Sequence, residues 1–116
     1  MMLHLQLKEQ IAQHFAPHLN KETVLLQDAL QLSLDNGVAV EIRYLDPAEY
    51  SIHWLCGEAA GRIDTAPLHP DLETFPNHFH DMEGNILKDR LTVHGAEPWS
   101  NVRTVLEALL ENPLVD

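Results

Sequence analysis

Histidine is the residue with the most unusual count in this sequence, with eight copies in 116 residues. His78 and His80 flank Phe79, and on a β-strand residues two apart share one face. Two adjacent imidazoles can begin a Zn²⁺ site that a third donor completes, and His69 or Asp64 is placed to be that donor. Neutral imidazoles also suit general acid–base chemistry near pH 7, with a carboxylate such as Asp64 orienting one ring. The candidate catalytic residues are therefore His78, His80, Asp64 and His69, and the candidate ligands for a divalent metal such as Zn²⁺ are His78, His80 and His69.

A His-x-His pair is weak evidence by itself, because about 0.5 such pairs are expected from this histidine content alone. The evidence for a site is strengthened by other polar residues that are expected on the same face of the sheet. The solvent face of two predicted strands carries His53, Arg62 and Asp64, and the same face can receive His78 and His80. Two interpretations remain open: a functional polar site, or histidines scattered over the surface for structural reasons.

Two amphipathic helices are predicted, one at each end of the chain. Leu7, Ile11 and Phe15 form an apolar stripe that ends near Ala16, before Pro17. The second stripe lies between an N-cap at Ser100 and a stop at Pro113. Its members are Val102, Val105, Leu106, Leu109 and Leu110.

Between the helices the hydrophobic period changes to two, which is typical of β-strands. Residues 30–34 and 38–44 predict a hairpin around Gly37. A two-residue loop would oppose apolar and charged rows, so we expect a three-residue loop that pairs Leu34 with Val38.

Further strands are expected downstream of the hairpin. Residues 50–56 predict a third strand and residues 62–64 a short fourth one, with Ile63 opposite Trp54 and Asp64 opposite His53. Residues 66–77 hold three prolines and read as a loop, which a short strand at 78–82 and a turn at 83–85 follow. Cys56 shares the face of Trp54 and is interpreted as a small buried hydrophobe.

These elements predict an α+β fold: a mostly antiparallel sheet of four to six strands, with the N-terminal and C-terminal helices packed on one face. The length favours a single domain over residues 1–116. With 45% apolar and 22% charged residues, the composition is that of a globular protein.

Charge and cysteine content restrict the partners and the compartment. Eighteen acidic and seven basic residues give a net charge of −11, and the basic residues form no cluster, so nucleic-acid binding is doubtful and a basic partner or a cation fits better. One cysteine, no apolar run long enough to span a bilayer and no signal peptide predict a cytoplasmic protein.

Half of the chain resembles the TumE family, small proteins described as the toxin half of a toxin–antitoxin pair. That family pattern has a Tyr/His/Trp strand, an Asp-Asn-Ala-Pro-His-His-Pro turn, a Phe-Pro-His-His-x-His segment and a Glu-Pro before the last helix. Matching residues are Asp64, Ala66, Pro67, His69, Pro70, Phe75, Pro76, His78, His80, Glu97 and Pro98. Departures from the pattern are Thr65 for Asn, Leu68 for His and Asn77 for His.

The resemblance implies a toxin that a cognate antitoxin protein restrains. Two hypotheses from different classes follow. The first is a toxin-like enzyme, a histidine-based hydrolase or nuclease, using His69, His78, His80 and Asp64. The second is a non-catalytic metal-binding or protein-binding module that presents a histidine-rich face. The sequence leaves the substrate and the oligomeric state open.

Overall fold

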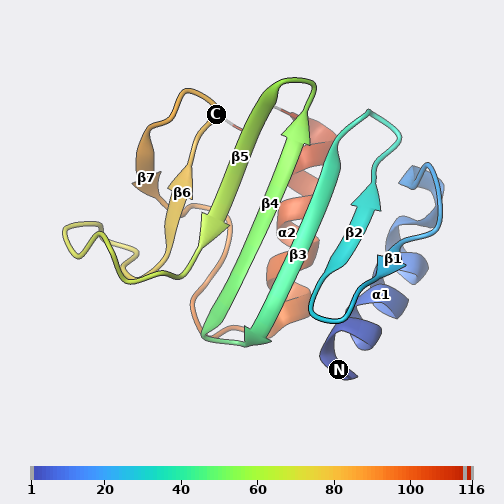
Figure 1. Ribbon diagram of the computed structural model, residues 1–116, viewed down its shortest axis with the longest axis horizontal. Coiled ribbons are helices and arrows are strands. Elements are labelled where there is room, and N and C mark those ends of the chain that lie inside the picture. Colours follow the sequence, from blue (N-terminus) through green and yellow to red (C-terminus); the bar gives the residue numbers. More distant parts are fainter. Residues whose placement is uncertain (1, 114, 116) are drawn as a thin grey trace.

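The computed structural model describes residues 2–113 and residue 115 (Figure 1). Helix α1 spans Met2–Phe15 and a short 3₁₀ helix, η1, spans Ala16–His18; helix α2 spans Pro98–Glu111. The strands are β1 (Val24–Leu25), β2 (Leu30–Ser33), β3 (Ala39–Asp46), β4 (Glu49–Cys56), β5 (Ala59–Asp64), β6 (His78–His80) and β7 (Ile86–Lys88).

The seven strands of the described residues form one sheet in which each strand pairs with its neighbours in sequence order, and every pairing is antiparallel. Both helices lie behind this sheet in Figure 1, which confirms the α+β class and the placement of the helices on one face. The strand count exceeds the expected four to six. Strands β1 and β7 are only two and three residues long, too short to show a period of two in the sequence.

The core lies between the sheet and the helices. The predicted stripe of Leu7, Ile11 and Phe15 is buried, and α1 ends at Phe15 as Pro17 requires. Helix α2 buries Val102, Val105, Leu106 and Leu109. Within the described residues, no helix is long and apolar enough to span a membrane.

The predicted N-cap of the last helix is wrong. Helix α2 begins at Pro98 after Glu97, so Ser100 lies inside the first turn and not before it. Proline is favoured at the first helical position because its missing N–H would have no partner there, and its fixed φ already suits the helix.

The hairpin of β2 and β3 has the expected register. Leu32 pairs with Val40, and the N–H of Leu34 donates to the carbonyl of Val38 at 2.8 Å. Gly37 closes the three-residue loop with φ of +90°, a conformation that side chains with a Cβ rarely adopt.

The register expected between the third and fourth strands is wrong by two residues. Ile63 pairs with Ile52 in place of Trp54, and Asp64 pairs with Ser51 in place of His53. The turn sets this register, because Cys56 pairs with Ala59 across a two-residue loop. A shift by two keeps every side chain on its face, so Asp64 still points to the solvent side of the sheet.

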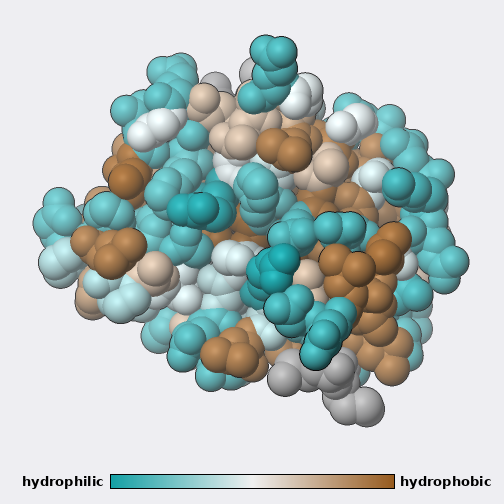
Figure 2. All heavy atoms as spheres, in the orientation of Figure 1, coloured by the Kyte–Doolittle hydropathy of each residue, from teal (hydrophilic) through white to brown (hydrophobic). Residues whose placement is uncertain are grey.

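The face of the sheet opposite the helices carries two cross-strand rows of mainly polar side chains. The Asp64 row contains Arg43, Ser51, Asp64, His78 and Lys88. The Arg62 row contains Glu41, His53, Arg62, His80 and Ile86. Figure 2, in the same orientation as Figure 1, shows hydrophilic residues over the centre of this open face.

Candidate functional site

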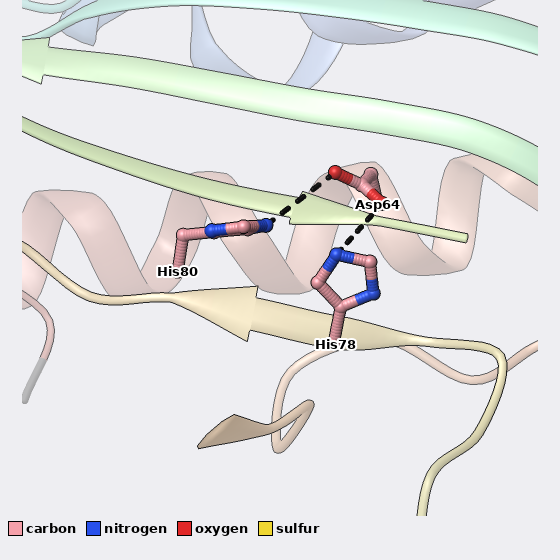
Figure 3. Close-up of side chains that lie close together, drawn as sticks. All are labelled: Asp64, His78 and His80. Atoms are coloured by element: carbon pink, nitrogen blue, oxygen red, sulfur yellow. Dashed lines mark ion pairs between the residues drawn. The ribbon is translucent and has the colours of Figure 1, made fainter. Parts of the chain in front are cut away.

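Asp64 is the centre of the polar cluster on the open face. Strand β5 ends at Asp64, whose side chain is only 14% exposed. Its Oδ2 lies 2.8 Å from Nε of Arg62. Its Oδ1 lies 3.0 Å from Nε2 of His78 (Figure 3). The N–H of Ala66 also donates to Oδ1 at 3.0 Å. The Nε–H of Arg62 therefore holds one carboxylate oxygen and the N–H of Ala66 holds the other, which fixes the orientation of the group.

His78 is buried although it lies on the solvent side of the sheet. Its Nδ1 lies 3.3 Å from the carbonyl oxygen of Pro76 and its Nε2 lies 3.0 Å from Oδ1 of Asp64; because both oxygens only accept, a neutral ring donates to one of the two. The ring of His69, from the loop between β5 and β6, meets the ring of His78 edge to face at a centroid distance of 4.8 Å. The loop thus covers His78 and holds its Nε2 toward Asp64.

His80 has a different hydrogen-bonding state. Its Nε2 lies 3.0 Å from Nη2 of Arg62, and a guanidinium only donates, so Nε2 is an unprotonated acceptor. Burial, and then the neighbouring charge of Arg62, lower the pKa of His80 below its usual value. The side chain is 27% exposed, and Nε2 lies 3.7 Å from Oδ2 of Asp64. A neutral imidazole with a lone pair beside a guanidinium can accept a proton.

The structure therefore brings Asp64, His78 and His80 together with Arg62, and His69 adjoins them through His78. One ligand atom from each of Asp64, His78 and His80 lies within 4.8 Å of the others, so these three could hold a metal ion. The sequence left two candidates for the third donor, His69 and Asp64. Asp64 is the candidate whose oxygens lie near the imidazoles of both His78 and His80. His53 follows Arg62 along the same row, on β4.

An open cleft of about 1010 Å³ adjoins the cluster and reaches Arg62 and Asp64. Arg43 and Ser51 line it from the neighbouring strands, and Pro67 lines it from the loop. Arg62 lines the cleft and also contacts His80, so its guanidinium lies between the cleft and His80.

The basic side chains of the open face are paired with carboxylates. Arg43 lies 3.2 Å from Asp28 and 3.0 Å from Glu41. Lys88 lies 3.4 Å from Glu73, and Arg62 binds Asp64. The described part of the face therefore offers no unpaired basic row to a polynucleotide backbone.

A buried polar network anchors β6 and was missed in the sequence. The Asn77 amide donates to the Tyr50 hydroxyl at 2.7 Å and to Asp89 at 3.0 Å. Thr92 bonds to both Tyr50 and Asp89. No motif marks these residues, since they come from three separate segments. The departure Asn77 from the family pattern is therefore part of the packing that positions His78.

The other two departures lie outside the cluster. The Thr65 hydroxyl accepts the N–H of Tyr50 at 3.1 Å and so joins the loop to β4. Leu68 is 70% exposed on the loop. Among the described residues, the side chains of Thr65, Leu68 and Asn77 form no hydrogen bond to Asp64 or His80.

An antiparallel sheet backed by two helices, with an Asp, Arg and His cluster on its open face, defines a small α+β protein equipped for proton transfer or cation binding. A family model described as Toxin TumE matches residues 8–113, so the chain belongs to the TumE toxin family. That match includes every residue of the cluster and confirms the resemblance. Comparisons with curated proteins and with solved structures found no match.

Proposed function

We propose that this protein is the toxin of a toxin–antitoxin module, and that its toxicity depends on a histidine-based hydrolytic site formed by Arg62, Asp64 and His80. Membership of the TumE toxin family supports the toxic role and implies an antitoxin protein as partner. The observation that carries the hydrolytic site is the 3.0 Å contact between Nη2 of Arg62 and Nε2 of His80 beside Asp64, because a guanidinium can only donate to an unprotonated nitrogen.

Each residue has a distinct role in this proposal. Arg62 binds an oxyanion of a substrate that enters the cleft, and its guanidinium then leaves Nε2 of His80. The released Nε2 acts as general base toward water or a substrate hydroxyl. Asp64 orients Arg62, whereas buried His78 is a positioning residue that holds Asp64. His69 packs against His78 and keeps solvent from it.

The charge pattern favours a small substrate over a polynucleotide. The chain carries −11, and the basic groups of the open face are already paired. A long strand would need several free cations, whereas a nucleotide or a similar phosphate ester needs only the exchangeable guanidinium of Arg62. We therefore propose a small phosphate ester as the substrate class, ahead of the nuclease alternative.

The test is growth of a bacterial host after tightly induced expression. The variants are the wild type, His78→Ala/His80→Ala, and the control His14→Ala/His18→Ala, which removes one exposed histidine from α1 and one from η1. We expect the wild type and the control to arrest growth and the site variant to relieve the arrest at an equal soluble level. Normal growth with the wild type would contradict the toxic role.

A second candidate function is a non-catalytic metal-binding or protein-binding module. The observation that favours it is the grouping of Asp64, His78 and His80 donor atoms within 4.8 Å. This alternative predicts a harmless protein whose histidine substitutions change binding and leave growth unaffected.

A further inference from the structure

We propose that Zn²⁺ binds to Asp64, His78 and His80 by displacing the guanidinium of Arg62, so that Arg62 competes with the metal for one position. The inference that bound Zn²⁺ inhibits the hydrolytic site rests on the proposed function. The inference that Zn²⁺ binds does not.

The donor set and its spacing suit Zn²⁺. Two imidazoles and a carboxylate are common ligands of this ion, with a fourth position left open. Metal–ligand bonds of about 2.0–2.1 Å place the donors of a tetrahedron about 3.3 Å apart. Oδ1 of Asp64 lies 3.0 Å from Nε2 of His78, and Oδ2 lies 3.7 Å from Nε2 of His80. The three ligand atoms all lie within 4.8 Å of one another, so side-chain movements of up to about 1.5 Å would complete three corners. Figure 3 shows both rings directed toward the carboxylate.

His78 already has the hydrogen bond that supports a metal-binding histidine. Its Nδ1 lies 3.3 Å from the carbonyl oxygen of Pro76, and the tautomer that donates from Nδ1 leaves a lone pair on Nε2 facing the site. Because His78 is buried under the loop, its ring is held in this orientation before any ion arrives. Part of the ordering that metal binding requires is thus built into the fold.

Arg62 holds the position that the ion would take. Its Nε lies 2.8 Å from Oδ2 of Asp64, and its Nη2 lies 3.0 Å from Nε2 of His80. These are two lone-pair positions that Zn²⁺ needs, and a guanidinium and a divalent ion repel each other at this range. The Arg62 side chain is 47% exposed and borders the cleft, so it has room to leave.

The exchange would regulate the proposed hydrolytic site. With Arg62 in place, Nε2 of His80 keeps a lone pair that can accept a proton. With Zn²⁺ in place, that lone pair is occupied and Arg62 is removed from its anchor on Asp64. Bound Zn²⁺ would therefore prevent His80 from acting as an acid or a base.

The chain provides a closely matched control for this proposal. Arg43 is also 47% exposed, lies on the same face and forms an Nε ion pair, at 3.0 Å, with a carboxylate two residues away. The metal-ligand group contains Asp64, His78 and His80, and Glu41 is not among them. Removing Arg43 thus deletes an equivalent cation without opening the proposed site.

The experiment measures Zn²⁺ binding to tag-free full-length protein at about pH 7.5, by competition with a chromophoric chelator. The variants are the wild type, Arg62→Leu, Arg43→Leu and His80→Ala, with thermal unfolding of each as the check on folding. We expect one Zn²⁺ per wild-type chain. Because hydrogen bonds to charged groups contribute substantially, Arg62→Leu should bind at least about tenfold more tightly. Arg43→Leu should stay within about twofold of the wild type, and His80→Ala should bind at least about tenfold more weakly.

Equal affinity of Arg62→Leu and the wild type would overturn the proposal, as would wild-type affinity in His80→Ala. The binding readout is independent of toxicity. Growth arrest that requires His80, without any zinc binding, would refute this inference alone; zinc binding by a harmless protein would refute the proposed function alone.

Discussion

Gly61 lies beneath the indole ring of Trp54, and we predict that Gly61→Ala destabilises the fold through this single contact. A Cβ at position 61 would lie 2.5 Å from both Cε2 and Nε1 of the indole. Ordinary van der Waals contacts begin at about 3.4 Å, so the ring would have to move by about 1 Å. Trp54 is buried and stacks against Phe79 at a centroid distance of 5.9 Å, which restricts that movement.

Two opposing effects determine how far Gly61→Ala lowers the free energy of unfolding. Overpacking of this kind costs about 3 kcal/mol at the upper end of its usual range. Replacing glycine in a strand recovers about 0.5–1 kcal/mol, because alanine loses less backbone entropy on folding. The net loss is about 2 kcal/mol, and for a chain of 116 residues it corresponds to a fall in Tm of about 8 °C.

The assay is urea denaturation of a double-mutant cycle with Trp54→Leu. The leucine side chain ends at Cδ and has no atoms at the indole positions that the new Cβ would meet, so Gly61→Ala should cost less than about 0.5 kcal/mol in that background. A coupling energy of about 1.5–2 kcal/mol is therefore expected. If Gly61→Ala lowered the free energy of unfolding equally in both backgrounds, the destabilisation could not come from contact with the indole.

Three further predictions concern the rest of the fold. Burial lowers the pKa of His4 from its ordinary 6.5, and Nε2 of His4 accepts the N–H of Tyr44. The unfolded chain therefore binds a proton more readily than the folded chain, and the free energy of unfolding falls as the pH drops below 6.5. His4→Gln keeps an acceptor but does not titrate; urea denaturation at about pH 7.5 and 5.5 should show a smaller loss for the variant, and equal losses would contradict this assignment. Asn77→Ala removes the amide donor from buried Asp89 and should lower the unfolding free energy by about 2–3 kcal/mol, whereas a loss below about 0.5 kcal/mol would show that the network contributes little. Leu68→His, which restores the family residue at a 70% exposed position, should change stability by less than about 0.5 kcal/mol in the same assay, and a larger change would place Leu68 in a contact that its exposure does not indicate.

The sequence predicted best the elements whose geometry follows from local rules. Alternation of apolar residues and the need to keep Leu32 and Val40 on one face determined the β2–β3 register. The helical stripes likewise identified the buried faces of α1 and α2. The β4–β5 register was wrong because periodicity alone does not distinguish registers two residues apart. Counting the residues of the Gly57–Glu58 turn would have resolved it.

The candidate site was only partly accessible to sequence reasoning. His78 and His80 were found from their spacing, and Asp64 from its place on the neighbouring strand. The bond from Arg62 to His80 depends on pairing between β5 and β6, two segments separated by a long loop. The Asn77 network combines residues from still more distant segments, and their types are common in loops, so nothing in their order indicated burial.

The role of the Asp64, Arg62 and His80 cluster in toxicity is tested by comparing two single variants from the same cross-strand row. His53 and His80 both lie in the Arg62 row, but His80 contacts Arg62 and Asp64 whereas His53 lies outside the metal-ligand group. Growth is followed after tightly induced expression of the wild type, His80→Ala and His53→Ala at matched soluble levels. We expect His80→Ala to restore growth and His53→Ala to arrest it like the wild type. Equal arrest by both variants would contradict the claim that toxicity runs through the Asp64, Arg62 and His80 cluster.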